Sequence, residues 1–595
     1  MRMLAAVIGL SAALFASVEL PSQELFLEEL PEVIERLLQH HEGKREIDGE
    51  LLVDSHKRFL ERVDPQKVYL LEHEVNPFVD RLREKEFLRL FERCPFAIYE
   101  QMAQVCKKAV YRARSARAQV HPVDNRLTVR HSYYASSEEE LLSRMRVWYL
   151  SQVCERVSGE TFSDGRWERA CEIVEDEIRA DEQSILELSQ RGSGQKALAQ
   201  AILESVVASF DVHSKVMDGQ QARKMRENLT KRSCGTGIEV GFDNGSCFIE
   251  KIVEGSPADT MGSLHVHDRI IAINGVSPEK MTRGNIESLL YGKEGEKVAL
   301  ELEGRSSGRR RLDVPCAEYT LLEGRVRGSK QRTKYGPIAV VELPGLYRAE
   351  KGGSSHEDLQ RILEQGPFAG IVLDLRKNLG GYITEAVDVV GLFIKTGVVV
   401  SAVYAGKEKA IFRDLDALCL HTGPVVVLIS SRTASAAEII AQALSDYGRA
   451  IIVGDVRSFG KGSVQAQTVT ERPGALPFKM TVGRFHSVSG ISPQGKGIYA
   501  DIVLAPSPFA VLENASSYED IAPLFVDRLE DIEGNERKWY SSYYLPFLQH
   551  PTDKYRKHIR ALREKRARRL VPNEQDPQLA EAVEILQDLL ELVSR

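Results

Sequence analysis

The sequence lacks the short patterns that mark the commonest metal, nucleotide and serine–histidine sites. Its eight cysteines form no C-x-x-C pair, and there is no H-E-x-x-H, no Walker-type phosphate loop and no G-x-S-x-G elbow. His213, His421 and His486 are widely spaced, and none belongs to a recognisable triad motif. These absences argue against a zinc site, a phosphate-binding loop and a Ser-His-Asp hydrolase. We therefore expect neither a metal nor a cofactor.

The sequence also has little net charge and no long apolar run beyond its N-terminus. A net charge of −7 over 595 residues gives no reason to propose nucleic acid as a partner. A basic stretch at 553–570 is interpreted as a solvated helix face, with a nucleic-acid patch as the alternative. No later run reaches the 18 apolar residues typical of a membrane span. With 43% hydrophobic and 28% charged residues, the chain resembles a soluble globular protein of three to five domains.

The N-terminus is typical of a secretory signal peptide. Arg2 is followed by an apolar run from Met3 to Phe15 and by the small residues Ala16 and Ser17. We predict a signal peptide over 1–17 and an exported mature protein; the alternative is an N-terminal membrane anchor. Export would permit disulfides, but eight cysteines allow 105 pairings, and we interpret them mainly as buried thiols.

Hydrophobic periodicity divides the rest of the chain. Helical spacing dominates 18–208, which we predict to be an all-helical domain. Short strands alternate with glycine turns over 233–306, as in a small mixed domain. Continuous apolar runs such as "FAGIVLDL" and "PVVVLIS" indicate strands buried on both faces. They predict an α/β core formed by 209–232 and 325–506, and a helical region at 507–595 follows. The predicted fold class is multidomain α+β.

A serine stands in a suggestive position within the α/β core. "PVVVLISSRTASAAEIIAQAL" predicts strand, turn and helix, with Ser435 at the turn or in the first helical turn. A helix start presents unpaired N–H groups, so the N–H of Ala436 could face a developing oxyanion. The alternative interpretation makes Ser435 a helix cap.

The candidate base for Ser435 is a lysine, because no histidine occurs between Ser430 and Gln467. Lys461 has a glycine on each side and follows the apolar strand "AIIVG", so burial would lower its pKa toward neutrality. Gln465 lies four residues later and could orient the amine. The alternative is a surface lysine in a glycine turn.

The small domain contains a candidate binding loop. "CGTGIEVGF" is a glycine-rich turn that enters a strand, and such turns expose backbone N–H groups. They can capture a peptide's terminal carboxylate while the peptide adds to the sheet as a strand. A plain hairpin turn is the alternative.

Taken together, the motifs resemble the carboxyl-terminal processing proteases, in particular the long tail-specific type of Gram-negative bacteria. "GTGIEV" and "IVEGSPADTMGSLHVHDRIIAINGV" resemble the family's PDZ domain, and "IVLDLRKNLGG" resembles its D-L-R-x-N-x-G-G segment. "TASAAE…GKGSVQ" and "MTVGRFHSVSGISPQGKGIYADIVL" follow in the family's order. The resemblance implies an α/β protease core with an inserted PDZ domain, flanked by N- and C-terminal helical domains.

The resemblance also implies roles for particular residues. Ser435 takes the nucleophile's place, Lys461 that of the general base, and Gln465 that of the glutamine assisting it. Asp446 matches a supporting aspartate. The oxyanion hole would use the backbone N–H of Ala436 and of Gly380 or Gly381. The substrate's carboxylate would be held by the loop of Gly235, Thr236, Gly237 and Ile238.

Three positions depart from the family's pattern. Ala437 replaces a second serine, "GDVRSFGKG" is one residue longer before the lysine, and "FDVHSKV" lacks the usual proline. None removes a required chemical group.

The activity implied is that of an ATP-independent serine endopeptidase of the periplasm, or secreted beyond it. Its substrates would be proteins with free apolar C-termini. The expected partners include an accessory lipoprotein and no nucleic acid, and the chain would be a monomer or a dimer. Two alternatives remain: a PDZ adaptor on an inactive protease domain, and an acyl-chain hydratase, which no cofactor pattern supports.

Overall fold

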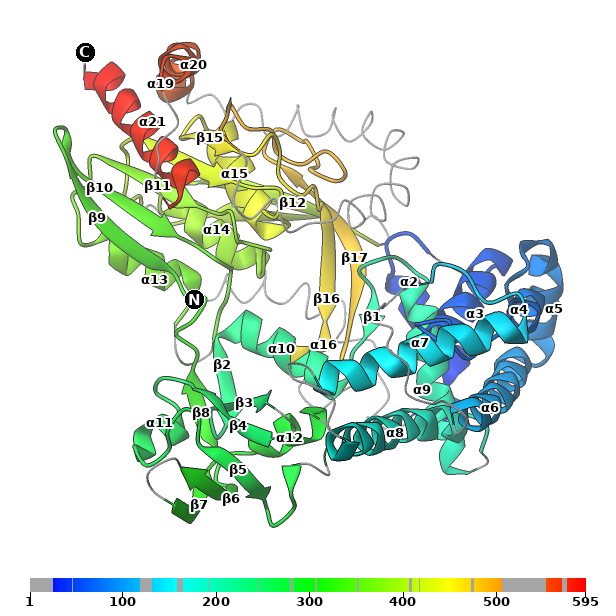
Figure 1. Ribbon diagram of the computed structural model, residues 1–595. Helices are drawn as coiled ribbons and strands as arrows, with labels where there is room; N and C mark the ends of the chain where they lie inside the picture. Colours follow the sequence, from blue (N-terminus) through cyan, green and yellow to red (C-terminus); the bar gives the residue numbers. More distant parts are fainter. Residues whose placement is uncertain are drawn as a thin grey trace.

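The computed structural model describes residues 25–505 and 553–594, except for short gaps (Figure 1). The gaps lie at 45, 118–130, 158–163, 191, 244–245, 279–280, 282, 305–307, 350, 352, 406–408, 417, 472–475 and 570–574. The predicted signal peptide over 1–17 and the predicted boundary at 507 lie outside the described residues. No helix within the described ranges has the length and hydropathy needed to cross a bilayer.

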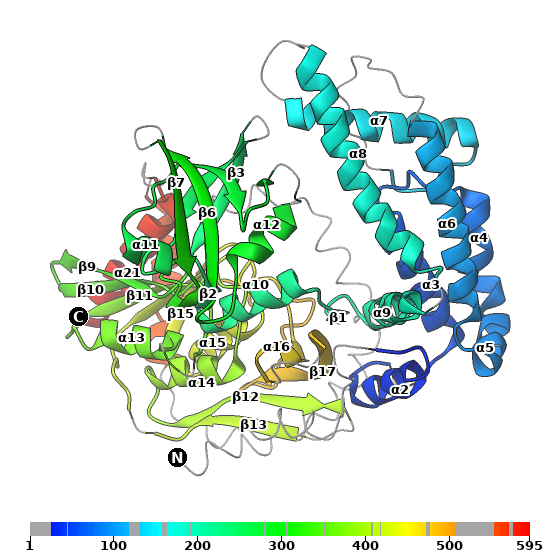
Figure 2. The same ribbon diagram turned by 90° about the horizontal axis from the view of Figure 1, so that it is seen from below.

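The N-terminal region is helical, as the periodicity predicts. It lies to one side of the remaining chain in both views (Figures 1 and 2). Its first helices bury one apolar face each; in α3, for example, Leu52, Phe59 and Leu60 are buried. The elements are α2 (Leu30–His40), α3 (Gly49–Val63), α4 (Glu72–Val79), η1 (Arg81–Arg83), α5 (Glu84–Arg93), α6 (Ala97–Arg117), α7 (Glu138–Val157), α8 (Asp164–Glu187) and α9 (Ser193–Ala208).

The small mixed domain forms a five-stranded antiparallel sheet in the order β3-β4-β5-β6-β7. Because β3 lies at the edge of this order, one side of it is unpaired within the sheet. A two-stranded ribbon of β2 and β8 joins the domain to the core. The elements are β2 (Arg232–Gly235), β3 (Ile238–Asp243), β4 (Ser246–Ile252), α11 (Pro257–Met261), β5 (Arg269–Ile273), α12 (Arg283–Leu290), β6 (Lys297–Gly304), β7 (Gly308–Pro315) and β8 (Ala317–Thr320).

The core contains a six-stranded sheet in the order β18-β15-β14-β11-β10-β9. Its five parallel strands follow one another in a single direction, and the predicted apolar runs form β11, β14 and β15, which are buried throughout. The strands are β9 (Arg327–Thr333), β10 (Gly336–Glu342), β11 (Gly370–Asp374), β14 (Val425–Ile429), β15 (Ala450–Gly454) and β18 (Ile502–Val503).

Helices cover both faces of this sheet (Figure 1). The helices α13 (Ser355–Leu363), α14 (Ile383–Gly391) and α15 (Ala436–Asp446) pack against one another on a single face. The C-terminal helices pack on the opposite face, where Tyr555, Leu562 and Leu586 share a core with the strands. These helices are α19 (Asp553–Arg556), α20 (Ile559–Ala567) and α21 (Pro577–Ser594).

A second sheet lies beside the first, in the order β1-β17-β12-β13, with β16 also paired to β17. It connects the core to the N-terminal helices, because β1 follows α9 and pairs with β17. Its elements are β1 (Lys215–Val216), α10 (Gly219–Thr230), β12 (Gly397–Tyr404), β13 (Lys409–Asp414), β16 (Ser463–Gln467), α16 (Thr468–Glu471) and β17 (Phe478–Ser487).

Two interpretations of the sequence can be compared with the described residues. All eight cysteines are free thiols, as interpreted, but only three of them are buried, Cys106, Cys247 and Cys316, so the expectation that most are buried is wrong. Within the described part of the basic stretch at 553–570, partly exposed side chains form ion pairs, Arg556 with Asp501 and Lys565 with Glu591, while Arg560 is 93% exposed. This pattern is consistent with the solvated helix face that the sequence indicates.

Candidate active site

The candidate residues lie on loops at one edge of the large sheet. Gly380 follows β11, Ser435 follows β14 and Lys461 follows β15, and these three parallel strands are neighbours. Their carboxyl ends therefore meet at the same edge, which is where open α/β sheets usually hold their ligands.

Ser435 has an unusual backbone conformation. It immediately precedes α15 at the N-cap position, and its φ of 57° is in the left-handed region, which a serine rarely adopts. Such strain persists only where surrounding contacts impose it, and it is concentrated at functional sites. Ser435 therefore does stand at the helix-capping position, as the alternative interpretation expected. Its backbone is strained, however, and its hydroxyl contacts a residue outside the helix.

That contact is with Lys461. The Nζ atom of Lys461 donates a hydrogen bond to Oγ of Ser435 at 3.4 Å. Burial and, to a smaller extent, the positive charge of Lys479 lower the pKa of Lys461 to about 8, while the charges of Glu438 and Asp211 oppose this shift. At pH 7.5 about a quarter of such lysines are neutral, against about one in a thousand at an ordinary pKa. A lysine in this state can accept a proton from a serine.

Gln465 completes the group that was predicted from the sequence. Its Oε1 accepts a hydrogen bond from Nζ of Lys461. Its Nε2 donates to Oγ of Ser463 at 2.8 Å and to Oγ1 of Thr481 at 3.3 Å, which fixes the orientation of the amide. The amide therefore holds the lysine amine beside Ser435.

A buried carboxylate that the sequence analysis missed joins the serine loop to the lysine loop. Glu438 Oε2 accepts the backbone N–H groups of Ser435 and Lys461, each at 2.8 Å. Its Oε1 accepts from Gly460 N–H at 2.7 Å and from Oγ of Ser458 at 2.5 Å. Burial raises the pKa of Glu438 to about 7, although the four donors favour its ionised form. The S-x-x-E spacing of a capping box was the available signal.

The glycines after β11 approach the serine closely. A β-carbon added to Gly380 would lie 2.8 Å from Cβ of Ser435 and 3.1 Å from the backbone nitrogen of Ala436. The N–H of Gly380 already donates to Oδ1 of Asn378 at 2.8 Å. Of the two predicted glycine donors, Gly381 is therefore the better candidate. Ala436 is the first residue of α15, so its N–H has no acceptor within the helix.

Other predicted candidates lie elsewhere. Asp446 ends α15, about 16 Å along the helix axis from Ser435, and accepts hydrogen bonds from Gln442 and Ser489. The structure thus places it as a support for the 487–491 loop rather than beside the dyad. His421 and His486 have no hydrogen bond to Ser435 or Lys461 in the described part of the chain.

His213 is closer to the site than its sequence position suggests. The charge of Lys461 contributes to lowering its pKa to about 4, although burial is the larger cause. Its Nε2 is buried and has no hydrogen-bond partner among the described residues. His213 is therefore a neutral neighbour of the lysine.

The predicted carboxylate loop leads into the edge strand β3. The N–H of Thr236 donates to the carbonyl of Leu290 at 2.9 Å, and the N–H of Ile238 makes a longer bond, 3.3 Å, to Oγ1 of Thr236. Gly235 and Gly237 have φ values of 155° and 81°. A Cβ at Gly237 would overlap Ser256, so only glycine fits there.

Comparisons with known proteins agree with this architecture. The profile of peptidase family S41 matches residues 337–504, that of the PDZ domain 222–303, and that of the tail specific protease N-terminal domain 33–219. The chain is a multidomain α+β protein with an S41 peptidase core. It belongs to the carboxy-terminal processing, or tail-specific, protease family.

Individual relatives are moderately similar. The chain is 32% identical to a carboxy-terminal-processing protease of Bartonella bacilliformis over 52% of this chain and 70% of that protein. It is 31% identical to a tail-specific protease of Haemophilus influenzae over 51% of this chain but only 45% of that protein. Among solved structures, the photosystem II D1 C-terminal processing protease matches 55% of this chain and 86% of its own with 23% identity and a TM-score of 0.32.

Proposed function

We propose that the protein is a serine endopeptidase in which Ser435 is the nucleophile and Lys461 the general base. The observation that supports this most directly is the 3.4 Å contact between Nζ of Lys461 and Oγ of Ser435, together with the lowered pKa of the lysine. A serine hydroxyl becomes an effective nucleophile only when a nearby base accepts its proton.

In the proposed reaction, Oγ of Ser435 attacks the carbonyl carbon of the scissile peptide bond while its proton moves to neutral Lys461. The N–H groups of Ala436 and Gly381 donate to the resulting oxyanion, and each such donor is typically worth about 100- to 1000-fold in rate. Lys461 then returns the proton to the leaving amine as the C–N bond breaks. Water attacks the acyl-enzyme, again with the lysine as base, and releases Ser435.

The test uses an unfolded reporter protein with a free apolar C-terminus. Wild type should cleave it, whereas Ser435→Ala and Lys461→Ala, each shown to be folded by circular dichroism, should not. A Lys231→Ala variant is a matched control, since Lys231 is another partly buried lysine with a lowered pKa, outside the site. Equal cleavage by all four proteins would refute the proposed dyad.

We also propose that the PDZ domain binds the C-terminal tails of exported proteins. The unpaired edge of β3 supports strand addition. In the loop from Gly235 to Ile238, the candidate donors to the carboxylate are the N–H of Gly237 and that of Ile238, whose bond to Thr236 is long, because the N–H of Thr236 is bonded to the Leu290 carbonyl. Amidation of the reporter's C-terminus should raise KM with little effect on kcat. Unchanged kinetics would contradict carboxylate capture. Export to the periplasm and a lipoprotein partner are part of the same proposal.

A further inference from the structure

The C-terminal helix α21 begins at the edge of the sheet that carries the candidate active site. Asp576 and Gln578 lie at its start, and the helix then crosses the sheet toward the opposite ends of the strands. Near its middle, Leu586 lies so close to Gly370 at the start of β11 that an added β-carbon there would be 2.8 Å from Cδ1 of Leu586. Contacts at the start of α21 and at Leu586 therefore together fix the direction in which the helix crosses the sheet.

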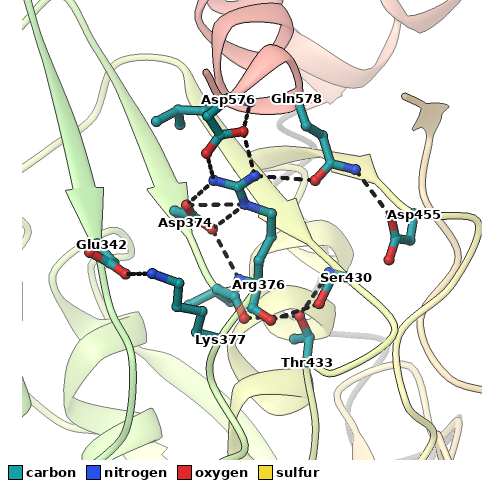
Figure 3. A network of polar contacts seen from close by, with 11 residues as sticks. Glu342, Asp374, Arg376, Lys377, Ser430, Thr433, Asp455, Asp576 and Gln578 are labelled. Carbon is teal, nitrogen blue, oxygen red and sulfur yellow. Dashed lines mark hydrogen bonds and ion pairs between the residues drawn. The ribbon is translucent and has the colours of Figure 1, made fainter. Parts of the chain in front are cut away.

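The first residues of α21 bind a buried arginine (Figure 3). The guanidinium of Arg376, 3% exposed, makes two parallel bonds to Asp576, at 2.8 and 2.6 Å, and further bonds to Asp374. Nη1 of Arg376 also donates to Oε1 of Gln578 at 3.3 Å. Paired carboxylate–guanidinium bonds of this kind restrict both the position and the orientation of the arginine.

Arg376 in turn contacts the loop that carries Ser435. Its carbonyl accepts a hydrogen bond from Oγ of Ser430 at 2.7 Å. The adjacent Leu375 carbonyl accepts from Oγ1 of Thr433 at 2.9 Å, and both side chains are almost completely buried (Figure 3). Two residues beyond Arg376, the Asn378 carbonyl accepts the N–H of Ala434 at 3.0 Å.

Gln578 connects the start of α21 to the loop that follows β15. Its Nε2 donates to Oδ1 of Asp455 at 3.1 Å, just after β15, and to the carbonyl of Ala505 at 2.9 Å. Oδ2 of Asp455 accepts the N–H of Ser431 at 2.8 Å. The start of α21 thus contacts the loops after β11 and β15 directly and the loop after β14 through Arg376 and Asp455.

We propose that Asp576 is a positioning residue, which through Arg376 sets the placement of the oxyanion segment 378–381 against Ser435. The role in catalysis rests on the proposed function above. The hydrogen bonds described above connect Asp576 to Arg376, which lies 200 positions earlier in the sequence and next to segment 378–381. Each of these bonds joins groups that are buried or partly buried. A small displacement of this segment would misplace the oxyanion donors, and errors near 1 Å lower rates by about 100-fold.

The variant Asp576→Asn tests this role with little disturbance of the helix. Oδ1 of Asp576 accepts the N–H of Leu579 at 3.1 Å, and asparagine is an equally good cap. The change therefore removes the charge opposite Arg376 and the oxygen that accepts from its Nη2, while the start of the helix stays capped. The matched control is Asp588→Asn. Asp588 lies on the same helix, is 5% exposed and is also bound to basic residues, Arg569 and Lys565, away from Arg376.

The first measurement is hydrogen–deuterium exchange in segments 375–382 and 430–436, which does not depend on activity. Asp576→Asn should increase exchange there, while Asp588→Asn should not. With the reporter, Asp576→Asn should lower kcat about tenfold or more at nearly constant KM, and Asp576→Glu should restore most of it. If Asp576→Asn does not fold, Gln578→Ala takes its place. It is expected to change exchange and kcat in the same direction but less strongly.

The outcomes are distinguishable. The proposal would be refuted if Asp576→Asn had the same exchange and the same kcat as wild type. It would also be refuted if Asp576→Asn and Asp588→Asn, at equal melting temperature, lost kcat to the same extent, because the role of Asp576 would then be purely structural. If wild type and Ser435→Ala are equally inactive, the proposed function fails, and the exchange data still decide whether Asp576 positions the segment.

Discussion

Ser435 and Lys461 donate their backbone N–H groups to the same oxygen atom, Oε2 of Glu438. The distance between the hydroxyl and the amine is therefore set by a buried carboxylate as well as by the two loops. Because both bonds are 2.8 Å long and the acceptor belongs to α15, the base loop is held against the helix that begins at the serine.

The first prediction concerns the pH dependence of cleavage. The pKa of Lys461 is lowered to about 8 by burial, and only its neutral form accepts a proton. kcat/KM should therefore rise with pH through about 8 and level off above it. The profile is measured with the reporter between pH 5.5 and about 9.5, within the range where the fold is intact. A flat profile with chemistry rate-limiting would contradict Lys461 as the base.

The second prediction uses two charges that act on Lys461 with opposite sign. Asp211 favours the charged lysine and Lys479 disfavours it. Asp211→Asn should therefore move the rise in kcat/KM to lower pH, and Lys479→Met should move it to higher pH.

Asp211 is also connected to the site by hydrogen bonds. Its carboxylate accepts from Oγ of Ser214, and Oγ of Ser214 accepts the N–H of Thr481, whose hydroxyl contacts Gln465. The oxygen of Asp211 that accepts from Ser214, Oδ2, also binds Nε2 of His41 in the N-terminal helical region at 2.7 Å. Shifts of the same sign in the Asp211 and Lys479 variants would show that electrostatic effects do not control the profile.

The third prediction concerns Glu438. Glu438→Gln replaces one acceptor oxygen by an NH₂ group, so at least one of the four donors loses its acceptor, at a cost of about 1–3 kcal/mol in stability. Because two of the donors are the backbone N–H groups of Ser435 and Lys461, kcat should fall strongly, by about 100-fold.

A buried glutamate far from the site provides the control for Glu438. Glu182, fully buried, pairs with Arg114 and Arg117 in the N-terminal helices. Glu182→Gln should lower the melting temperature and leave kcat per folded molecule nearly unchanged. Similar kcat in the two variants would contradict the role given to Glu438.

Much of the site could be predicted from the sequence, because its residues occur in short segments with strong local signals. Ser435 follows an apolar strand and opens a helix, and Lys461 and Gln465 stand four residues apart beside glycines. Their approach across 26 residues was predicted from the order of the family's motifs, and the structure does bring them together.

The rest depended on tertiary contacts that no local pattern records. Glu438 has the spacing of a helix cap, but three of its four donors come from the loop at 458–461. The sequence alone could not decide whether Gly380 or Gly381 supplies the second oxyanion donor. The structure favours Gly381, because the N–H of Gly380 donates to Oδ1 of Asn378. The docking of α21 on Arg376 joins residues 200 positions apart.

The fourth prediction concerns the glycine nearest to Ser435. Gly380 has a φ of 102°, and an added β-carbon would lie 2.8 Å from Cβ of Ser435. Gly380→Ala should therefore displace the serine or the oxyanion segment and lower kcat by about 100-fold or more. Gly255→Ala is the matched control, because Gly255 also has a positive φ, 74°, but no atom lies within 4 Å of its added β-carbon. Activity of Gly380→Ala equal to that of Gly255→Ala would refute the close approach.

The fifth prediction concerns stability in acid. Burial, with a smaller effect of Arg449, lowers the pKa of His421 to about 4, and the side chain is 6% exposed. Above about pH 7.5 the histidine is neutral in both states and has no effect on the pH dependence of folding. As the pH falls from about 6.5 to 4, the unfolded chain binds a proton that the folded protein does not. The free energy of unfolding therefore decreases, by at most about 3 kcal/mol for this group, and the loss levels off below pH 4.

Urea denaturation of wild type and His421→Gln at pH 7.5, 6.0 and 5.0 measures this contribution. The variant should be less stable than wild type at pH 7.5, because it loses the contact with the Pro424 carbonyl and packs less well against Phe393. Its stability should nevertheless fall less steeply with acid, since one of the buried neutral histidines is gone. Parallel curves for the two proteins would mean that His421 is protonated equally in the folded and unfolded states, contrary to its buried position.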